Sequence, residues 1–84
     1  MKLLFVEDDD ESRDVLKALL ELDGHDVTAA WNGIKGWQAF QSGEFSVVLS
    51  DWLMPEMDGL ELCRRIRASD RLSYSYIILV TALH

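Results

Sequence analysis

The residues best suited to chemistry in this sequence are polar side chains that directly follow short apolar runs. Glu7 and Asp8 follow one such run, Asp51 follows a second, and Thr81 follows a third. Short apolar runs are typical of buried strands, and ligands of parallel sheets bind beyond the carboxyl ends of the strands. The sequence therefore predicts three carboxylates and a hydroxyl at one edge of a sheet.

Three carboxylates held close together repel one another, which raises their pKa values unless a cation neutralises them. Mg²⁺ prefers oxygen ligands and often combines a few carboxylates with phosphate oxygens. A carboxylate can also act as a nucleophile and form an aspartyl-phosphate. From these residues alone Asp51 has two possible roles, as a reactive group in such a site or as a residue that merely ends its strand.

The elements that must position these side chains alternate along the chain. Strands are predicted over residues 2–6, 27–30, 45–50 and 77–80, with a helix in each interval. Asp9 or Asp10, Asn32, and Asp58 or Gly59 are expected at the helix starts, with Gly24 and Gly43 ending the first two helices. This alternation predicts an α/β fold in which a parallel sheet has helices on both faces.

Composition limits the class of protein. The 84 residues predict one domain, 1–84, and the net charge of −7 argues against direct binding of nucleic acid, whose phosphates select basic surfaces. No run approaches the ~20 apolar residues that span a membrane, and no signal peptide is evident. The single cysteine, Cys63, is expected in the core, and its lack of a disulfide partner favours a cytoplasmic location.

Three motifs in this order resemble the receiver domain of two-component response regulators. They are Val6-Glu7-Asp8-Asp9, the run from Asp51 to Gly59 (DWLMPEMDG), and Val80-Thr81-Ala82. The resemblance covers the whole chain. It implies a flavodoxin-like, doubly wound parallel sheet of the form (βα)3β and a phosphoprotein that acts in phosphorelay signal transduction.

The resemblance also implies a role for each matching position. Asp51 corresponds to the phospho-acceptor and Asp8 to a direct ligand of Mg²⁺, while Glu7 corresponds to a second acidic member of the metal site that acts through water. The backbone carbonyl of Leu53 corresponds to another metal ligand, and Thr81 to the switch hydroxyl that contacts the phosphoryl group. In this register Asp9, Asp10 and Glu11 fall outside the site, and we interpret them as the solvated start of a helix.

The family pattern implies a sensor histidine kinase or a phosphotransfer protein as the partner. The protein would be a signalling phospho-acceptor and not an enzyme, with self-phosphorylation and dephosphorylation at most. Receiver domains continue with a further helix, strand and helix, which carry a lysine near the phosphoryl group, and the given sequence stops before them at His84. We therefore expect a domain incomplete at its C-terminal end. Either its exposed fourth-strand edge and apolar surface favour self-association, or the chain is a fragment of a longer protein.

Two other functions remain open on the sequence. One is a degenerate interaction module that keeps the receiver fold without phosphoryl turnover, which the missing lysine would favour. The other is a Mg²⁺-dependent phosphohydrolase of the haloacid-dehalogenase type, which also uses an aspartate nucleophile. Those enzymes place a second aspartate two residues after the nucleophile, and here that position is Leu53.

Overall fold

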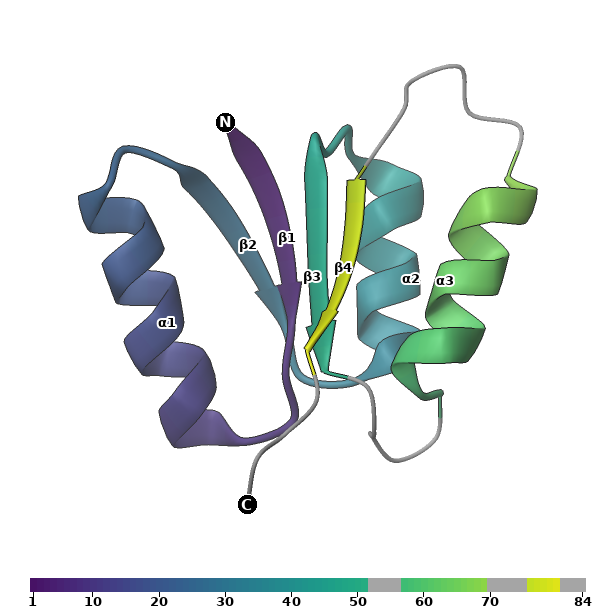
Figure 1. Ribbon diagram of the computed structural model, residues 1–84, viewed down its shortest axis with the longest axis horizontal. Helices are drawn as coiled ribbons and strands as arrows, with labels where there is room; N and C mark the ends of the chain where they lie inside the picture. Colours follow the sequence, from purple (N-terminus) through teal and green to yellow (C-terminus); the bar gives the residue numbers. More distant parts are fainter. Residues whose placement is uncertain (52–56, 70–75, 81–84) are drawn as a thin grey trace.

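The computed structural model describes residues 1–51, 57–69 and 76–80. Four strands and three helices alternate along the chain: β1 (Lys2–Val6), α1 (Asp10–Leu22), β2 (Asp26–Ala30), α2 (Gly33–Ser42), β3 (Val47–Asp51), α3 (Gly59–Ala68) and β4 (Tyr76–Val80). The strands form a parallel sheet in the order β2-β1-β3-β4, with α1 on one side and α2 and α3 on the other (Figure 1). The predicted α/β fold with helices on both faces is confirmed.

Each helix begins at a residue whose side chain caps it. Asp9, Asn32 and Asp58 accept hydrogen bonds from the backbone N–H three residues later, at 2.9, 2.8 and 2.9 Å. These bonds satisfy donors that have no partner within the helix, which is why such residues are favoured at helix starts. Gly24, with φ of 90°, follows the end of α1 in a conformation that favours glycine. The predicted helix starts are thus confirmed.

Alternation of side chains along the strands divides the core into two parts. Leu4 and Val6 of β1 face α2 and α3, where they join Phe40, Val48 and Leu62 in the larger buried cluster. The neighbouring residues Leu3 and Phe5 point the other way and pack with Val27 and the partly buried Leu20 of α1. The carboxyl ends of all four strands point toward the lower edge of Figure 1.

The strand boundaries differ slightly from those predicted. The third strand was expected over 45–50 but runs from Val47 to Asp51, because Phe45 packs in the core before the ladder with β1 begins. Asp51 is therefore the last residue of the strand, paired with Val80 of β4, and not the first residue of a loop. β2 and β4 each begin one residue earlier than predicted.

None of the described helices has both the length and the apolar character needed to cross a bilayer.

Candidate functional site

Asp51 reaches the edge of the sheet from one of its two central strands. β3 lies between β1 and β4, so the carboxyl end of this strand has a neighbour on each side. The Asp51 side chain is buried, and its Oδ1 atom has no hydrogen-bond partner among the described residues. A buried polar atom without a partner costs about 1–3 kcal/mol, so its presence calls for a functional explanation.

Glu7 and Asp8 reach the same edge from β1. The backbone N–H of Glu7 donates to the carbonyl oxygen of Ala30 at 3.0 Å, which extends the ladder between β1 and β2 by one residue. The Glu7 carbonyl accepts a hydrogen bond from the Arg13 guanidinium at 3.0 Å. Glu7 is thus fixed through its backbone from two sides, while its carboxylate is partly buried and Asp8 is exposed.

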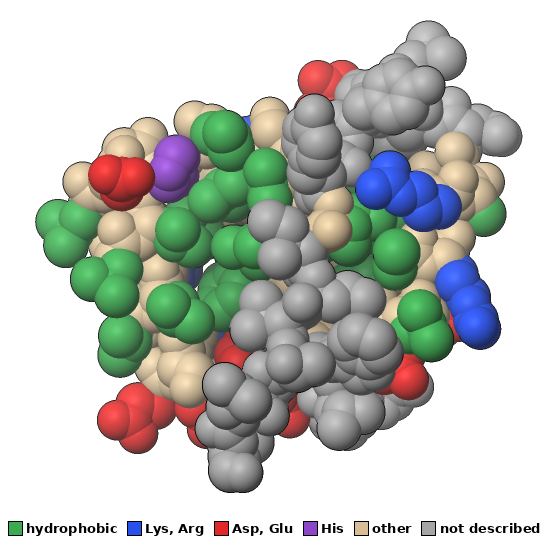
Figure 2. Space-filling model, viewed as in Figure 1, with side chains coloured by type: hydrophobic (Ala, Val, Ile, Leu, Met, Phe, Trp, Pro, Cys, Tyr) green, Lys and Arg blue, Asp and Glu red, His purple; other side chains and the backbone are tan. Residues whose placement is uncertain are grey.

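Carboxylate oxygens of Glu7, Asp8 and Asp51 lie within 4.8 Å of one another. This grouping is the juxtaposition that the sequence motifs imply. Several acidic side chains appear along the lower edge of the space-filling view, below the ends of the strands (Figure 2). Three carboxylates, one of them buried with an oxygen that has no partner among the described residues, suit a hard divalent cation such as Mg²⁺.

The grouping of Glu7, Asp8 and Asp51 changes the pKa of one of the three carboxyls. The pKa of the Glu7 carboxyl is raised from 4.5 to about 7. Burial is the largest cause; the hydrogen bond from the Asp9 N–H opposes it, and the neighbouring carboxyls of Asp8 and Asp51 add to the rise. Near neutral pH the Glu7 carboxyl is therefore partly protonated, and a cation bound beside it would favour its charged form.

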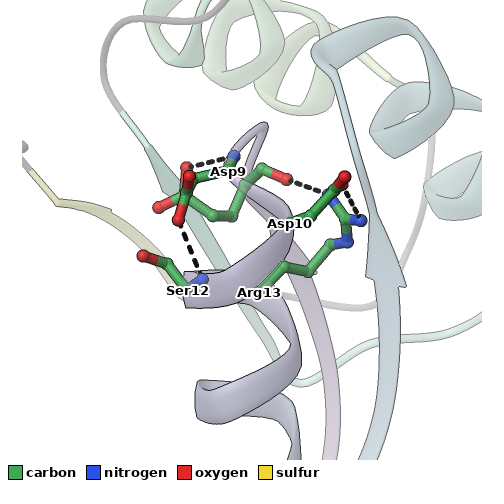
Figure 3. A network of polar contacts seen from close by, with 5 residues as sticks. Asp9, Asp10, Ser12 and Arg13 are labelled. Atoms are coloured by element: carbon green, nitrogen blue, oxygen red, sulfur yellow. Dashed lines mark hydrogen bonds and ion pairs between the residues drawn. The ribbon is translucent and has the colours of Figure 1, made fainter.

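The acidic residues after Asp8 serve the helix. Asp9 caps α1 through Ser12, and its own N–H donates to the Glu7 carboxylate at 3.3 Å. Asp10 pairs with Arg13, and Figure 3 shows these labelled residues around the first turn of α1. Asp9, Asp10 and Glu11 are exposed, as expected for a solvated helix start. Acidic side chains there also complement the positive end of the helix dipole.

Two residues that hold Glu7 were not identified from the sequence. Arg13 acts through its contact with the Glu7 carbonyl, and Ala30 through its own carbonyl. Ala30 could have been found by extending the parallel register one residue beyond Val6, because the pairing places Val6 opposite Ala30. Arg13 lay on the expected polar side of its helix, and no motif distinguishes it from a solvated residue.

Leu53 and Thr81, the other two predicted site residues, lie outside the described residues. Cys63, expected in the core, is half-buried on α3. The described part of the site is therefore made by Glu7, Asp8 and Asp51.

Comparison with known proteins identifies a consistent set of relatives. The chain matches the model of the response regulator receiver domain over residues 3–84. It is 41% identical over 83 residues to a chemotaxis protein CheY homolog of Campylobacter jejuni, covering 96% of this chain and 64% of that protein. It is 46% identical over 65 residues to the transcriptional regulatory protein CseB of Streptomyces avermitilis, covering 77% of this chain and 28% of CseB.

The fold of the chain also matches solved structures of receiver proteins. The response regulator protein TrrA of Thermotoga maritima, solved in complex with Mg²⁺ and BeF, superposes with a TM-score of 0.88 and 34% identity. That match covers 98% of this chain and 70% of TrrA. Of the two sequence relatives, by contrast, the chain spans less than two thirds: 64% of the CheY homolog and 28% of CseB.

Proposed function

The chain belongs to the response regulator receiver domain family, and from this premise we propose that it accepts a phosphoryl group on Asp51 with the help of Mg²⁺. The observation that carries the proposal is the buried Asp51 carboxylate. Its Oδ1 has no partner among the described residues, and one of its oxygens lies within 4.8 Å of carboxylate oxygens of Glu7 and Asp8. β3 pairs with β1 as far as Ser50 and with β4 as far as Asp51, and this pairing holds the carboxylate in place for attack on phosphorus.

The reaction is a transfer between two side chains. One Asp51 carboxylate oxygen forms a bond to phosphorus while the bond from phosphorus to the donor histidine nitrogen breaks. The donor imidazole leaves with the electron pair of that bond and ends as neutral histidine after taking a proton from solvent. The product is an aspartyl-phosphate, which water can later hydrolyse, and this is the extent of the activity that we assign to the chain.

Glu7, Asp8 and Asp51 would hold the metal through their carboxylates, together with the Leu53 carbonyl that the family pattern implies. When bound, Mg²⁺ would neutralise charge on these carboxylates and on the transferred phosphoryl oxygens. Thr81 would donate its hydroxyl to the phosphoryl group, as the resemblance implies. The similarity to TrrA, which was solved with Mg²⁺ and BeF, supports this assignment.

The proposed partner is a sensor histidine kinase or a phosphotransfer protein in the cytoplasm. Self-association is a second proposed interaction. β4 lies at an edge of the sheet that the described residues form, and edge strands pair readily with other chains. Exposed apolar side chains on α1 add to the surface available for association.

The test is intact mass spectrometry after incubation with acetyl phosphate and Mg²⁺. We expect the wild type to gain the mass of one phosphoryl group and Asp51→Asn to gain none. Asp58→Asn is the matched control. Asp58 is an exposed aspartate that caps α3, so this variant should still gain the mass of one phosphoryl group. No adduct at any Mg²⁺ concentration, or an adduct that persists in Asp51→Asn, would overturn the proposal and favour the interaction module.

A further inference from the structure

A groove lies between α2 and α3, toward the ends of the two helices. Both helices begin at the carboxyl edge of the sheet and run back along it, so the groove lies toward the opposite edge from the acidic site (Figure 1). Its volume is about 620 Å³, within the range of about 300–1,000 Å³ that small-molecule sites occupy. Six residues line it: Trp37, Phe40 and Gln41 from α2, Arg65 and Ala68 from α3, and Ser69, which caps the end of α3.

One wall of the groove is aromatic. The rings of Trp37 and Phe40 are nearly parallel, with an interplanar angle of 15° and 6.1 Å between their centroids. Phe40 is 3% exposed and belongs to the larger core cluster, against which the partly buried Trp37 packs. The stack thus joins the indole ring to the core, and a ring supported in this way can stack with a second planar group.

The other wall carries a positive charge. Arg65 is exposed, and its guanidinium forms no hydrogen bond or ion pair with another described residue. Glu61 lies one turn earlier on α3, at a spacing that favours a salt bridge, yet these two side chains form none. The guanidinium is therefore available to an anion in the groove, and it can bind a carboxylate through two parallel hydrogen bonds.

Charge also limits which anion fits. The net charge of the chain is −7, so the protein as a whole repels a polyanion such as a nucleoside triphosphate. Among the described residues that line the groove, Arg65 is the one cation, and it matches a single negative charge. The Ser69 hydroxyl already donates to the Ile66 carbonyl at 2.7 Å, so it does not add a second strong donor for the anion.

The surroundings of the groove favour a small molecule over a protein partner. Protein interfaces have an apolar centre that contributes most of the binding energy. The large hydrophobic side chains that are exposed in the described chain lie at Met1, along α1, and around the starts of α2 and α3, and none of them lines the groove. The exposed residues next to the groove in sequence, Gln38, Ser42 and Arg67, are polar.

We propose that the groove between α2 and α3 binds a small planar aromatic monocarboxylate. The ring of the ligand stacks on the Trp37 indole, and its carboxylate pairs with the Arg65 guanidinium. This binding goes beyond the phosphoryl transfer proposed above and does not rest on it, because none of the three clustered carboxylates lines the groove.

The test is a titration of the isotope-labelled chain with β-naphthoate, followed through the backbone amide shifts by NMR. Neutral β-naphthamide is the matched probe, because it keeps the ring and loses the charge. Arg65→Gln removes the guanidinium, and Ala68→Glu adds a carboxylate to the groove. Arg67→Gln is the matched control, since it makes the same change at an exposed residue of α3 that does not line the groove. All three positions are exposed, so urea unfolding should show little loss of stability.

We expect saturable binding of β-naphthoate with a Kd of about 1 mM or below, as for a ligand of this size with ordinary efficiency. The shifts should concentrate at the ends of α2 and α3. Loss of the charge in β-naphthamide, or of the guanidinium in Arg65→Gln, should weaken binding about fivefold, the upper end for an exposed ion pair. Ala68→Glu should weaken it at least as much, while Arg67→Gln and Asp51→Asn should bind as the wild type does.

Three results would overturn the inference: no saturable shifts at the groove, equal affinity for the two probes, or wild-type affinity in both Arg65→Gln and Ala68→Glu. An equal loss in Arg67→Gln would also overturn it, because the anion would then respond to the net charge of the chain and not to the groove. Failure of the chain to form a phosphoryl adduct would leave the inference standing, since the titration requires no phosphorylation of Asp51.

Discussion

The two faces of the sheet are covered to very different extents. On the face of α2 and α3, nine buried residues of the described chain form one cluster, and Leu62 of α3 is 1% exposed. On the face of α1 the corresponding cluster has three buried residues, and α1 itself contributes none. Hydrophobic side chains gather on the left of Figure 2, over α1 and between this helix and the sheet.

The two faces of the sheet therefore contribute differently to the stability of the fold and to the surface beside the site. Val48 of β3 and Met57 both lie in the larger cluster, so the strand that carries Asp51 is packed on the face that α2 and α3 cover. Glu7 is instead held from the other side by the first turn of α1, through hydrogen bonds involving Arg13 and Asp9. One face fixes the fold, while the other offers an apolar surface and the start of a helix beside the site.

The largest predicted effect is a loss of stability when a buried side chain on the face of α2 and α3 is truncated. Leu62→Ala should lower the free energy of unfolding by about 2–5 kcal/mol, because a fully buried leucine leaves a cavity when truncated. Leu20→Ala on the α1 face should cost about 1 kcal/mol, since Leu20 is only partly buried. Urea unfolding followed by circular dichroism measures both losses. Equal losses would contradict the contrast between the two faces.

The second prediction concerns the site, where the two faces meet. Because Glu7 has a pKa raised to about 7, it carries a proton below that pH and Mg²⁺ must displace it. Mg²⁺ affinity should therefore fall as the pH is lowered from 8 to 6, by up to about tenfold per pH unit below the pKa. A fluorescence titration at several pH values measures this dependence.

The same raised pKa has a consequence without metal. A carboxyl that binds its proton more tightly in the folded state stabilises the fold fully below its unfolded pKa of 4.5, and this contribution is lost as the pH rises toward 7. The Tm of the wild type should thus fall relative to that of Glu7→Gln across this window. An identical pH dependence of wild type and Glu7→Gln, in either measurement, would show that Glu7 does not titrate there.

Much of the fold could be predicted from local patterns because this chain obeys them. Asn32 and Asp58 cap helices as expected, Gly24 follows a helix, and β1, β3 and β4 each contain a short apolar run. The start of β3 was misplaced because Phe45 is apolar and continues the run, although it packs in the core before pairing starts. The apolar pattern of a sequence predicts which residues are buried, and a buried residue such as Phe45 can lie outside the hydrogen-bonded strand.

The candidate site was predictable only in part. Its carboxylates could be grouped because strand order and a specific motif bring Glu7, Asp8 and Asp51 to one edge. The Arg13 contact with the Glu7 carbonyl could not be predicted, because it follows from the tertiary position of α1 and not from a motif.

The smallest effect on stability is predicted for the exposed face of α1, where the change should instead appear in association. Leu19 and Leu22 are 56% and 85% exposed, so replacing both with glutamine should alter the free energy of unfolding by no more than about 0.5 kcal/mol per site. If this face contributes to the proposed self-association, sedimentation velocity at micromolar concentrations should show a shift toward monomer. Leu60→Gln on α3, at 40% exposed, is the matched control and should leave the distribution unchanged. An unchanged distribution in the α1 variant, or a wild type that is already monomeric, would show that the apolar surface of this face does not drive association.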